Sequence, residues 1–500
     1  MNYPTKTNTL ILLVHSLSKA EKRLFSLQAQ LHDGDKVYLH LLELIEENKS
    51  AEDVYVAFTR NYPDKSYETA AKYLYKILMD CLLRQREKQD IQTETFNHIS
   101  KAGILFEREL FDEAFTELDK AKKLAIEFEN DSLQILIQRT ELKYLSSLDF
   151  KGISERELVA GQMKLNEIMK YSRSLNQHTQ LYDILKYRLM HKGYARSDKQ
   201  KENLNDLVLS ELHLIANSSY RGFEAEKLHL LFQATYYLNS GNYKSAIRLY
   251  KELLSIFEEN RRLILNPPVY YLSAIQGILD SLHIAELYDE MPFFITKLKE
   301  IEQGHYSVEF ALKVKAIIFH YESIPLANHG LSQEINTLQE NYEDTLFRKS
   351  HLLRPDEQLR LYLNIVTLSL ATGELRQAQK SMKKILASGK LFHKFPLFRT
   401  ARLINLLIQA EQGNHAFIPG EIASIRRSHQ SEKPIFYTEK LIFWYAQACP
   451  LPFYKPFRQK LLKQFHEKKK LVLTNKYERQ LLKTFDFLDW IEKRLTKNNN

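Results

Sequence analysis

The stretch "FQATYYLNSGNYKSAIRLYKELLSI", residues 232–256, contains the pattern that decides the fold of this chain. Small and aromatic side chains recur in it at helical spacing: Ala234, Tyr237, Ala246 and Tyr250. We expect two helices, over residues 225–238 and 243–258, that cross where alanine lets their axes approach closely. Gly241 between them suits a helix end, because glycine accepts a left-handed backbone.

Each side of such a hairpin stays apolar and must be covered by another hairpin, so the units are expected in an array. Six residues take the position of Ala246: Ala114, Ala246, Met291, Ile335, Ala378 and Ile418. From Ala246 onward these markers recur at a nearly constant interval. The gap between Ala114 and Ala246 is three such intervals long, so further copies are expected with centres near Ala160 and Leu204.

The quoted stretch resembles a tetratricopeptide repeat (TPR), with departures at Leu230, where tryptophan is common, and at Leu253, which replaces a small residue. Its spacing exceeds the roughly 34 residues of a standard TPR. We therefore expect a degenerate TPR-like superhelix, an α-solenoid of helical hairpins. HEAT-type repeats share the longer spacing and stay open as an alternative.

The composition favours an all-α fold. The 500 residues include 14 Gly and 13 Pro, fewer than β-hairpin turns require, and none of the prolines lies between Pro63 and Pro267. The two cysteines, Cys81 and Cys449, predict neither a disulfide framework nor a metal site. The apolar run at residues 10–14 is too short to span a membrane, and it lacks the cleavage site of a signal peptide. A cytoplasmic protein without a transmembrane segment is expected.

We expect three domains: an N-terminal helical bundle (1–95), a TPR-like array (96–449) and a basic helical cap with a tail (450–500). The motifs "LVHSLSKAEKRLF", "GDKVYLHLLELI" and "YLYKILMDCLL" in the first of these resemble the start of uncharacterised bacterial TPR-containing proteins, mostly from Bacteroidota. That resemblance covers roughly the first 130 residues. It implies a helical repeat protein and no known biochemical activity.

The N-terminal segment also has a DNA-binding interpretation, because the helices after Ser50 and Ser66 are arranged somewhat like a helix-turn-helix. In that interpretation four side chains face the major groove and two contact phosphates: Tyr67, Glu68, Thr69 and Lys72, with Arg60 and Lys65. Residues 1–95 carry a net charge of −1, although residues 56–88 carry +3. DNA-binding modules are usually basic, so a capping bundle is the favoured interpretation.

The C-terminal segment, residues 451–500, carries a net charge of +8. Three prolines, Pro450, Pro452 and Pro456, indicate a boundary at the start of this segment. Two helices are expected over residues 455–470 and 475–496. Six basic side chains crowd the first of these: Arg458, Lys460, Lys463, Lys468, Lys469 and Lys470. They suit an acidic partner, nucleic acid or an anionic membrane, or else the solvated face of a capping helix, which is favoured.

No catalytic signature is present in the sequence: there is no glycine-rich phosphate loop, no HExxH and no nucleophile elbow. Helical histidines lack the paired spacing of metal ligands: His98, His191, His229, His283 and His320. The 28 Tyr and 27 Phe suit packing between hairpins better than stacking on the bases of a nucleic acid. We expect no enzymatic activity, no cofactor and no metal.

The favoured function is a scaffold or adaptor that binds a protein or peptide in the concave groove of the array. Register relative to Ala246 predicts these groove residues: Thr235, Asn239, Gln276, Asp280, His320 and Thr367. Nucleic acid is the less favoured partner. The alternative is a transcriptional regulator with a helix-turn-helix-like element at its N-terminus and a TPR-like domain that senses a peptide.

Overall fold

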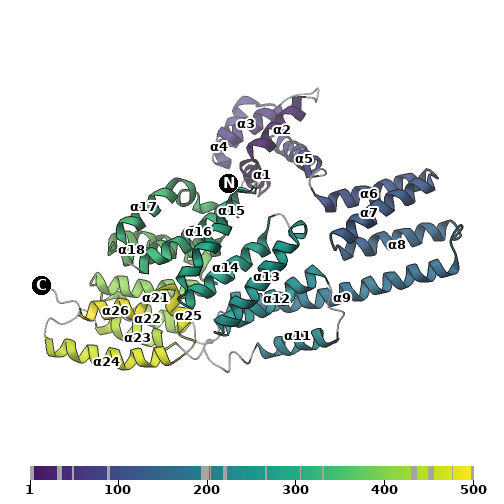
Figure 1. Ribbon diagram of the computed structural model, residues 1–500. Helices are drawn as coiled ribbons and strands as arrows, with labels where there is room; N and C mark the ends of the chain where they lie inside the picture. Colours follow the sequence, from purple (N-terminus) through teal and green to yellow (C-terminus); the bar gives the residue numbers. More distant parts are fainter. Residues whose placement is uncertain are drawn as a thin grey trace. The chain divides into compact units, whose positions relative to one another are not determined.

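The computed structural model contains only helices, with no strand among the residues that it describes (Figure 1). These are residues 5–30, 37–47, 50–86, 90–192, 202, 204–217, 222–264, 267–304, 306–328, 331–428, 436–448, 455–475 and 477–496. The expectation of an all-α protein is therefore confirmed for this part of the chain.

The chain divides into two compact units, residues 1–172 and 173–500. The division lies inside α9 (Glu155–Lys192). The boundaries expected after residues 95 and 449 stay predictions, and Cys449, Pro450 and Pro452 lie outside the described residues.

The first unit contains these helices before α9: α1 (Thr5–Ser16), α2 (Lys19–Gln30), α3 (Val37–Glu47), α4 (Ala51–Asn61), α5 (Tyr67–Arg86), α6 (Ile91–Glu107), α7 (Phe111–Glu127) and α8 (Asp131–Ser147). Helices α1 to α5 bury one apolar core, which includes Leu41, Ile45 and Phe58. Helices α6, α7 and α8 share a second, smaller core around Ala102 and Ala121.

In the second unit, the helices up to α18 are α11 (Asn205–Asn217), α12 (Phe223–Asn239), α13 (Tyr243–Glu259), α14 (Val269–Ile284), α15 (Met291–Glu302), α16 (Val308–Asn328), α17 (Ser332–Tyr342) and α18 (Pro355–Ala371). They are followed by α19 (Leu375–Ala387), α20 (Gly389–Phe392), α21 (Pro396–Glu411), α22 (Phe417–Ser428), α23 (Tyr437–Ala448), α24 (Lys455–Thr474), α25 (Arg479–Thr484) and α26 (Phe487–Thr496). Short 3-10 or π turns lie at Arg261–Leu263, Tyr288–Glu290, Glu343–Phe347 and Ser350–Leu352.

The hairpin expected at residues 225–258 is present as α12 and α13, which pack against each other. Ala234 and Ala246 are both fully buried, as their place at the helix crossing requires. Gly241 has a φ of +83°, the left-handed conformation expected for a residue that ends a helix.

The same turn recurs where other helices meet. Beyond α12, the amide three residues past the helix end donates to the carbonyl five residues earlier, here Asn242 to Tyr237 at 2.9 Å. This bond defines the Schellman motif. Equivalent bonds follow α6, α7, α8, α14, α18 and α21: Leu110 to Leu105, Asn130 to Ala125, Phe150 to Leu145, Leu287 to Leu282, Glu374 to Ser369 and Asn414 to Gln409.

The six marker residues of the sequence pattern all lie within the first four residues of a helix and are all at most 2% exposed: Ala114, Ala246, Met291, Ile335, Ala378 and Ile418. Leu204, at one interpolated centre, is also buried. Ala160, at the other, is exposed, because it lies inside the long helix α9 and not at a crossing of two short ones.

Helices α13 and α15 run in the same direction. Lys251 pairs with Glu290, which immediately precedes α15, at 2.7 Å. Two helical turns further along each segment, Glu258 pairs with Lys297 at 2.5 Å. Both pairs join residues 39 positions apart in the chain.

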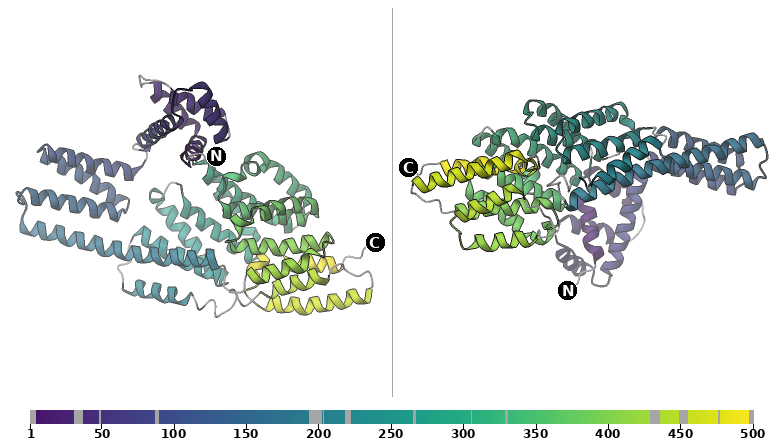
Figure 2. Two further views of the ribbon diagram at one scale, coloured as in Figure 1. Left: turned by 180° about the vertical axis from the view of Figure 1, so that it is seen from behind. Right: turned by 90° about the horizontal axis from the view of Figure 1, so that it is seen from below.

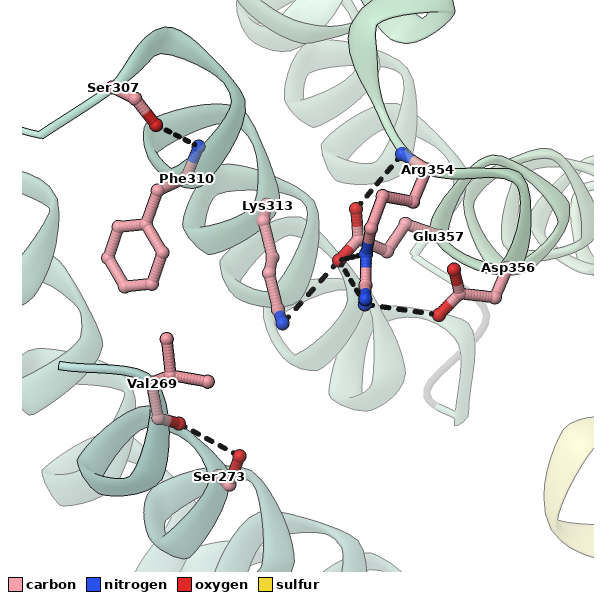
Figure 3. Close-up of polar contacts among 8 residues, drawn as sticks. All are labelled: Val269, Ser273, Ser307, Phe310, Lys313, Arg354, Asp356 and Glu357. Atoms are coloured by element: carbon pink, nitrogen blue, oxygen red, sulfur yellow. Dashed lines mark hydrogen bonds and ion pairs between the residues drawn. The ribbon is translucent and has the colours of Figure 1, made fainter. Parts of the chain in front are cut away.

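Helices α16 and α18 also run in the same direction. Lys313 lies 3.5 Å from Glu357 near the start of both helices, as Figure 3 shows beside the hydrogen bond by which Ser307 caps α16. Further along both helices, the Asn364 amide donates to the Ser323 hydroxyl at 3.3 Å. Contacts also join α12 to α14, α14 to α16, α18 to α21 and α21 to α23. Each helix in the series α12, α14, α16, α18, α21 and α23 therefore contacts the next one in that series.

The C-terminal helices pack on α23 and are continuous with its core (Figure 2). Leu461 and Phe465 of α24 are buried, whereas Phe457 is 47% exposed. The prediction of a single helix over residues 475–496 was wrong. Phe485 is extended between α25 and α26, and the Asp486 carboxylate accepts hydrogen bonds from the Leu488 and Asp489 amides, which starts a new helix.

Candidate functional site

A polar cluster lies on α14, α16 and α18, at the point where α25 contacts α14. We use the name "polar cluster" for five side chains: Asp280 and His283 on α14, His320 and Tyr321 on α16, and Arg360 on α18. Lys483 of α25 enters this cluster. Its ammonium and the Asp280 carboxylate are each less than one-fifth exposed.

Asp280 is the centre of the hydrogen bonding. Lys483 Nζ lies 2.5 Å from Asp280 Oδ1, and the Tyr321 hydroxyl lies 2.9 Å from the same oxygen. The Tyr321 hydroxyl is also 3.2 Å from the carbonyl oxygen of Gln276, one turn earlier on α14. A lysine from the far end of the chain is therefore held by a carboxylate that α14 and α16 position together.

His283 contacts the backbone of the same lysine. Its Nε2 lies 3.3 Å from the Lys483 carbonyl oxygen. A carbonyl only accepts, so Nε2 carries the proton and Nδ1 is the unprotonated nitrogen. His283 Nδ1 and His320 Nδ1 are buried and have no hydrogen-bond partner among the described residues.

Charge and burial fix the protonation of the polar cluster. Burial raises the pKa of Asp280, but the charges of Lys483 and Arg360 outweigh it and bring the pKa down to about 2. Burial, aided by the Arg360 charge, lowers the pKa of His320 to about 3. Burial and the Lys483 charge lower the pKa of His283 to about 4. At neutral pH the site therefore surrounds the Lys483 ammonium with one carboxylate, two neutral imidazoles and the Arg360 guanidinium.

Three of the six predicted groove residues come together at this place. Tyr321 joins Gln276 and Asp280 by hydrogen bonds, and it stacks edge-on with the neighbouring His320. Arg360 and His320 are close enough for the guanidinium charge to affect the imidazole. Gln276, Asp280 and His320 thus lie next to one another on α14 and α16, and their role in a binding groove stays a prediction.

The other three predicted residues bond within their own hairpins or helices. Thr235 Oγ1 lies 3.3 Å from the Tyr250 hydroxyl. Asn239 is buried, and its amide nitrogen donates to the Thr235 carbonyl at 2.6 Å. Thr367 Oγ1 donates to the Asn364 carbonyl at 2.8 Å.

Sequence reasoning missed three members of the site: Tyr321, Arg360 and Lys483. A signal for Arg360 existed, since Asp280, His320 and Arg360 follow one another at equal intervals along the chain. No local pattern points to Lys483, because 203 residues separate it from Asp280.

The six basic residues of α24 divide into two groups. Lys469 pairs with Glu492 of α26, Lys468 lies over the Trp444 ring at 5.7 Å, and Arg458 is half-buried. Lys460, Lys463 and Lys470 are exposed. Half of the group therefore packs against the fold, as a capping helix would.

In the N-terminal segment, Ser50 caps α4 by accepting the Asp53 amide at 3.1 Å. Glu68, Thr69 and Lys72 of α5 are exposed. Tyr67 is buried against Phe58, with the rings edge to face at 5.4 Å. It therefore belongs to the core and does not face outward as the DNA-binding interpretation requires.

Among the described residues, no group of His, Cys, Asp and Glu is placed to hold a metal ion, and no helix has the length and apolarity to cross a membrane. An open cavity of about 530 Å³ lies between α13, α14 and α15. Its lining includes Arg261 and Lys297, balanced by Glu258 and Glu300. Comparisons of the chain with protein-family models, curated proteins and solved structures found no match.

Proposed function

We propose that this chain is a non-enzymatic scaffold or adaptor, built as a TPR-like superhelical array, that binds a protein or peptide segment on the face formed by α14, α16 and α18. Register supports the array: contacts between every second helix join residues 39 to 45 positions apart, as in the pairs Lys251–Glu290, Asp280–Tyr321 and Gln276–Tyr321. A nearly constant separation is typical of stacked repeats, in which each unit contacts its neighbours.

The direction of the helices supports the same proposal. Helices α16 and α18 run in one direction, and so do α13 and α15. The Schellman turn that links α12 to α13 recurs after α14, α18 and α21. In such an array the first helices of successive hairpins form one continuous surface, and that surface is where repeat proteins bind extended or helical segments.

One observation carries the binding function: a helical segment from elsewhere in the chain already sits against this face. Helix α25 is six residues long and places Lys483 against Asp280, while His283 donates a hydrogen bond to the Lys483 carbonyl. A carboxylate that recognises a side chain and an imidazole that recognises the backbone are the two kinds of contact that a peptide site requires.

The test is a selection of random peptides, displayed on phage, with the full-length chain as the target. Selected peptides are then measured against Asp280→Asn and against Asp289→Asn, an exposed aspartate on the turn before α15 that serves as the matched control. We expect peptides that contain lysine and bind about tenfold more weakly to Asp280→Asn only. Peptides that bind both variants and the unmodified chain equally would remove this face as the binding site.

The DNA-binding alternative is not proposed. One of its four groove-facing side chains, Tyr67, is buried against Phe58. Residues 1–95 carry a net charge of −1, which offers little attraction to phosphate.

A further inference from the structure

The C-terminal segment has two polar anchors, one on each side of α25. We use the name "strap" for residues 477–485. At one end, the buried Glu478 carboxylate accepts hydrogen bonds from the Tyr437 and Thr438 amides, at 2.6 and 3.1 Å, and from the Thr438 hydroxyl, at 2.7 Å. It thereby caps the start of α23, where free amides favour a negative charge. At the other end, Lys483 pairs with Asp280 of α14.

The two ends of the strap are held by different forces. Leu481 belongs to the apolar core shared by α18 to α26, whereas α14 belongs to the core shared by α12 to α16. The contacts that join Lys483 to α14 are polar: an ion pair with Asp280 and a hydrogen bond from His283. Water or another cation can replace polar contacts, so Lys483 can leave Asp280 while Leu482 and Phe485 beside it stay packed against the core shared by α18 to α26.

The contacts at Lys483 recognise a particular local structure. Lys483 is the penultimate residue of α25, so its carbonyl is one of the last four in the helix, which have no partner within the helix. His283 satisfies that carbonyl, and Asp280 binds the side chain of the same residue. Together they recognise a lysine in the last turn of a helix. A lysine in an extended segment does not present this combination of a helix-end carbonyl and an ammonium on the same residue.

We propose that the strap is an intramolecular ligand: Lys483 occupies the polar cluster, and a partner helix with a lysine in its last turn must displace it to bind. The proposal rests on the proposed function, since it names the partner and the regulation of the same face. An empty cluster leaves the largely buried Asp280 carboxylate without the ammonium that contacts it and with the Arg360 charge to balance it, so an occupant of this chemistry is favoured whether it comes from this chain or from a partner. The linked strap competes at a high effective concentration and weakens the partner's apparent affinity.

The test uses the full-length chain and a fluorescent synthetic peptide with the sequence of residues 475–486, NKYERQLLKTFD. Its binding is measured by anisotropy to the unmodified chain, to Lys483→Gln, and to Lys493→Gln, an exposed lysine of α26 that serves as the matched control. We expect Lys483→Gln to bind about tenfold more tightly than the other two, because its cluster is vacant. A peptide with glutamine in place of the lysine that corresponds to Lys483 is expected not to bind, and adding Asp280→Asn to Lys483→Gln is expected to abolish binding.

Equal affinity of the peptide for Lys483→Gln and the unmodified chain would overturn the proposal. Circular dichroism and melting of each variant confirm that Lys483→Gln is folded. If it is not, amide hydrogen exchange of residues 477–485 in the unmodified chain replaces it: a saturating lysine peptide is expected to accelerate exchange there, and unchanged exchange in the presence of bound peptide would overturn the proposal.

These outcomes separate the inference from the function on which it rests. Phage-selected peptides that depend on Asp280, together with a strap peptide that does not prefer Lys483→Gln, would overturn the inference and leave the binding function standing. Failure of every selected peptide to depend on Asp280 would instead overturn the binding function.

Discussion

Lys483 Nζ and Asp280 Oδ1 lie 2.5 Å apart although 203 residues separate them in the chain. Both side chains are less than one-fifth exposed. The contact joins the last part of the chain to the middle of the helical series, so it bears both on stability and on access to the face of α14, α16 and α18.

The pair predicts a measurable coupling. Asp280→Asn and Lys483→Gln each leave one largely buried charge without its partner, so each is expected to lower the free energy of unfolding by about 2 kcal/mol. The double variant is expected to lose less than the sum, because neither charge remains. Urea unfolding followed by circular dichroism gives all four values. Strict additivity would show that the two residues do not interact in solution.

Acid is expected to destabilise the second unit through His283 and His320. Their pKa values are lowered to about 4 and about 3, below the usual value of 6.5 in the unfolded chain. The unfolded state therefore binds protons first, and the stability that the neutral imidazoles confer is complete above pH 6.5 and is lost as the pH falls toward 4. The unfolding midpoint measured from pH 7.5 to 4.5 checks this.

The matched variants for the pH experiment are His283→Gln with His320→Gln, and His393→Gln at an exposed position. The variant with His283→Gln and His320→Gln is expected to show a smaller fall of the unfolding midpoint below pH 6.5. His393→Gln is expected to show the same fall as the unmodified chain. A decline of the same size in all three proteins would mean that other groups cause it.

Close packing at Gly277 gives a third prediction. A Cβ atom at this position would lie 2.3 Å from the Tyr250 ring, between α13 and α14. Gly277→Ala is therefore expected to destabilise by about 1–3 kcal/mol, because the ring must move. Gly420→Ala, in α22, meets no atom within 4 Å and is expected to stabilise by about 0.5–1 kcal/mol through helix propensity. Thermal melts in which both variants shift in the same direction would contradict this account.

The turns give a fourth prediction. Glu109 and Glu286 have φ values of +62° and +60°, which cost a side chain about 1 kcal/mol and cost glycine little. Glu109→Gly and Glu286→Gly are therefore expected to raise the free energy of unfolding by about that amount each. The converse variant, Gly373→Ala at φ +80°, meets no atom within 4 Å and is expected to lose a similar amount through the backbone alone. Unchanged urea midpoints would contradict the backbone argument.

Those turns also mark where sequence reasoning was sufficient and where it was not. Gly241 identified the end of α12, because glycine is the usual residue in a left-handed turn. Glu109 and Glu286 adopt the same conformation, but glutamate gives no such signal. At the C-terminus, Asp486 starts α26 within a run that is otherwise compatible with one continuous helix.

The candidate site was predictable only in part. A repeat register assigns equivalent positions in successive hairpins. Three of the residues that it selected, Gln276, Asp280 and His320, lie next to one another in the structure. The same register did not identify Arg360, which lies seven residues before the expected position, Thr367. Lys483 lies outside the series altogether, and only folding brings it to Asp280.

The most direct test of the account is the affinity of one phage-selected, lysine-containing peptide for three full-length proteins, measured by isothermal titration. The account predicts that Asp280→Asn binds about tenfold more weakly than the unmodified chain, and that Asp289→Asn binds as the unmodified chain does. Equal affinity of all three would contradict the claim that the face of α14, α16 and α18 binds a partner through Asp280.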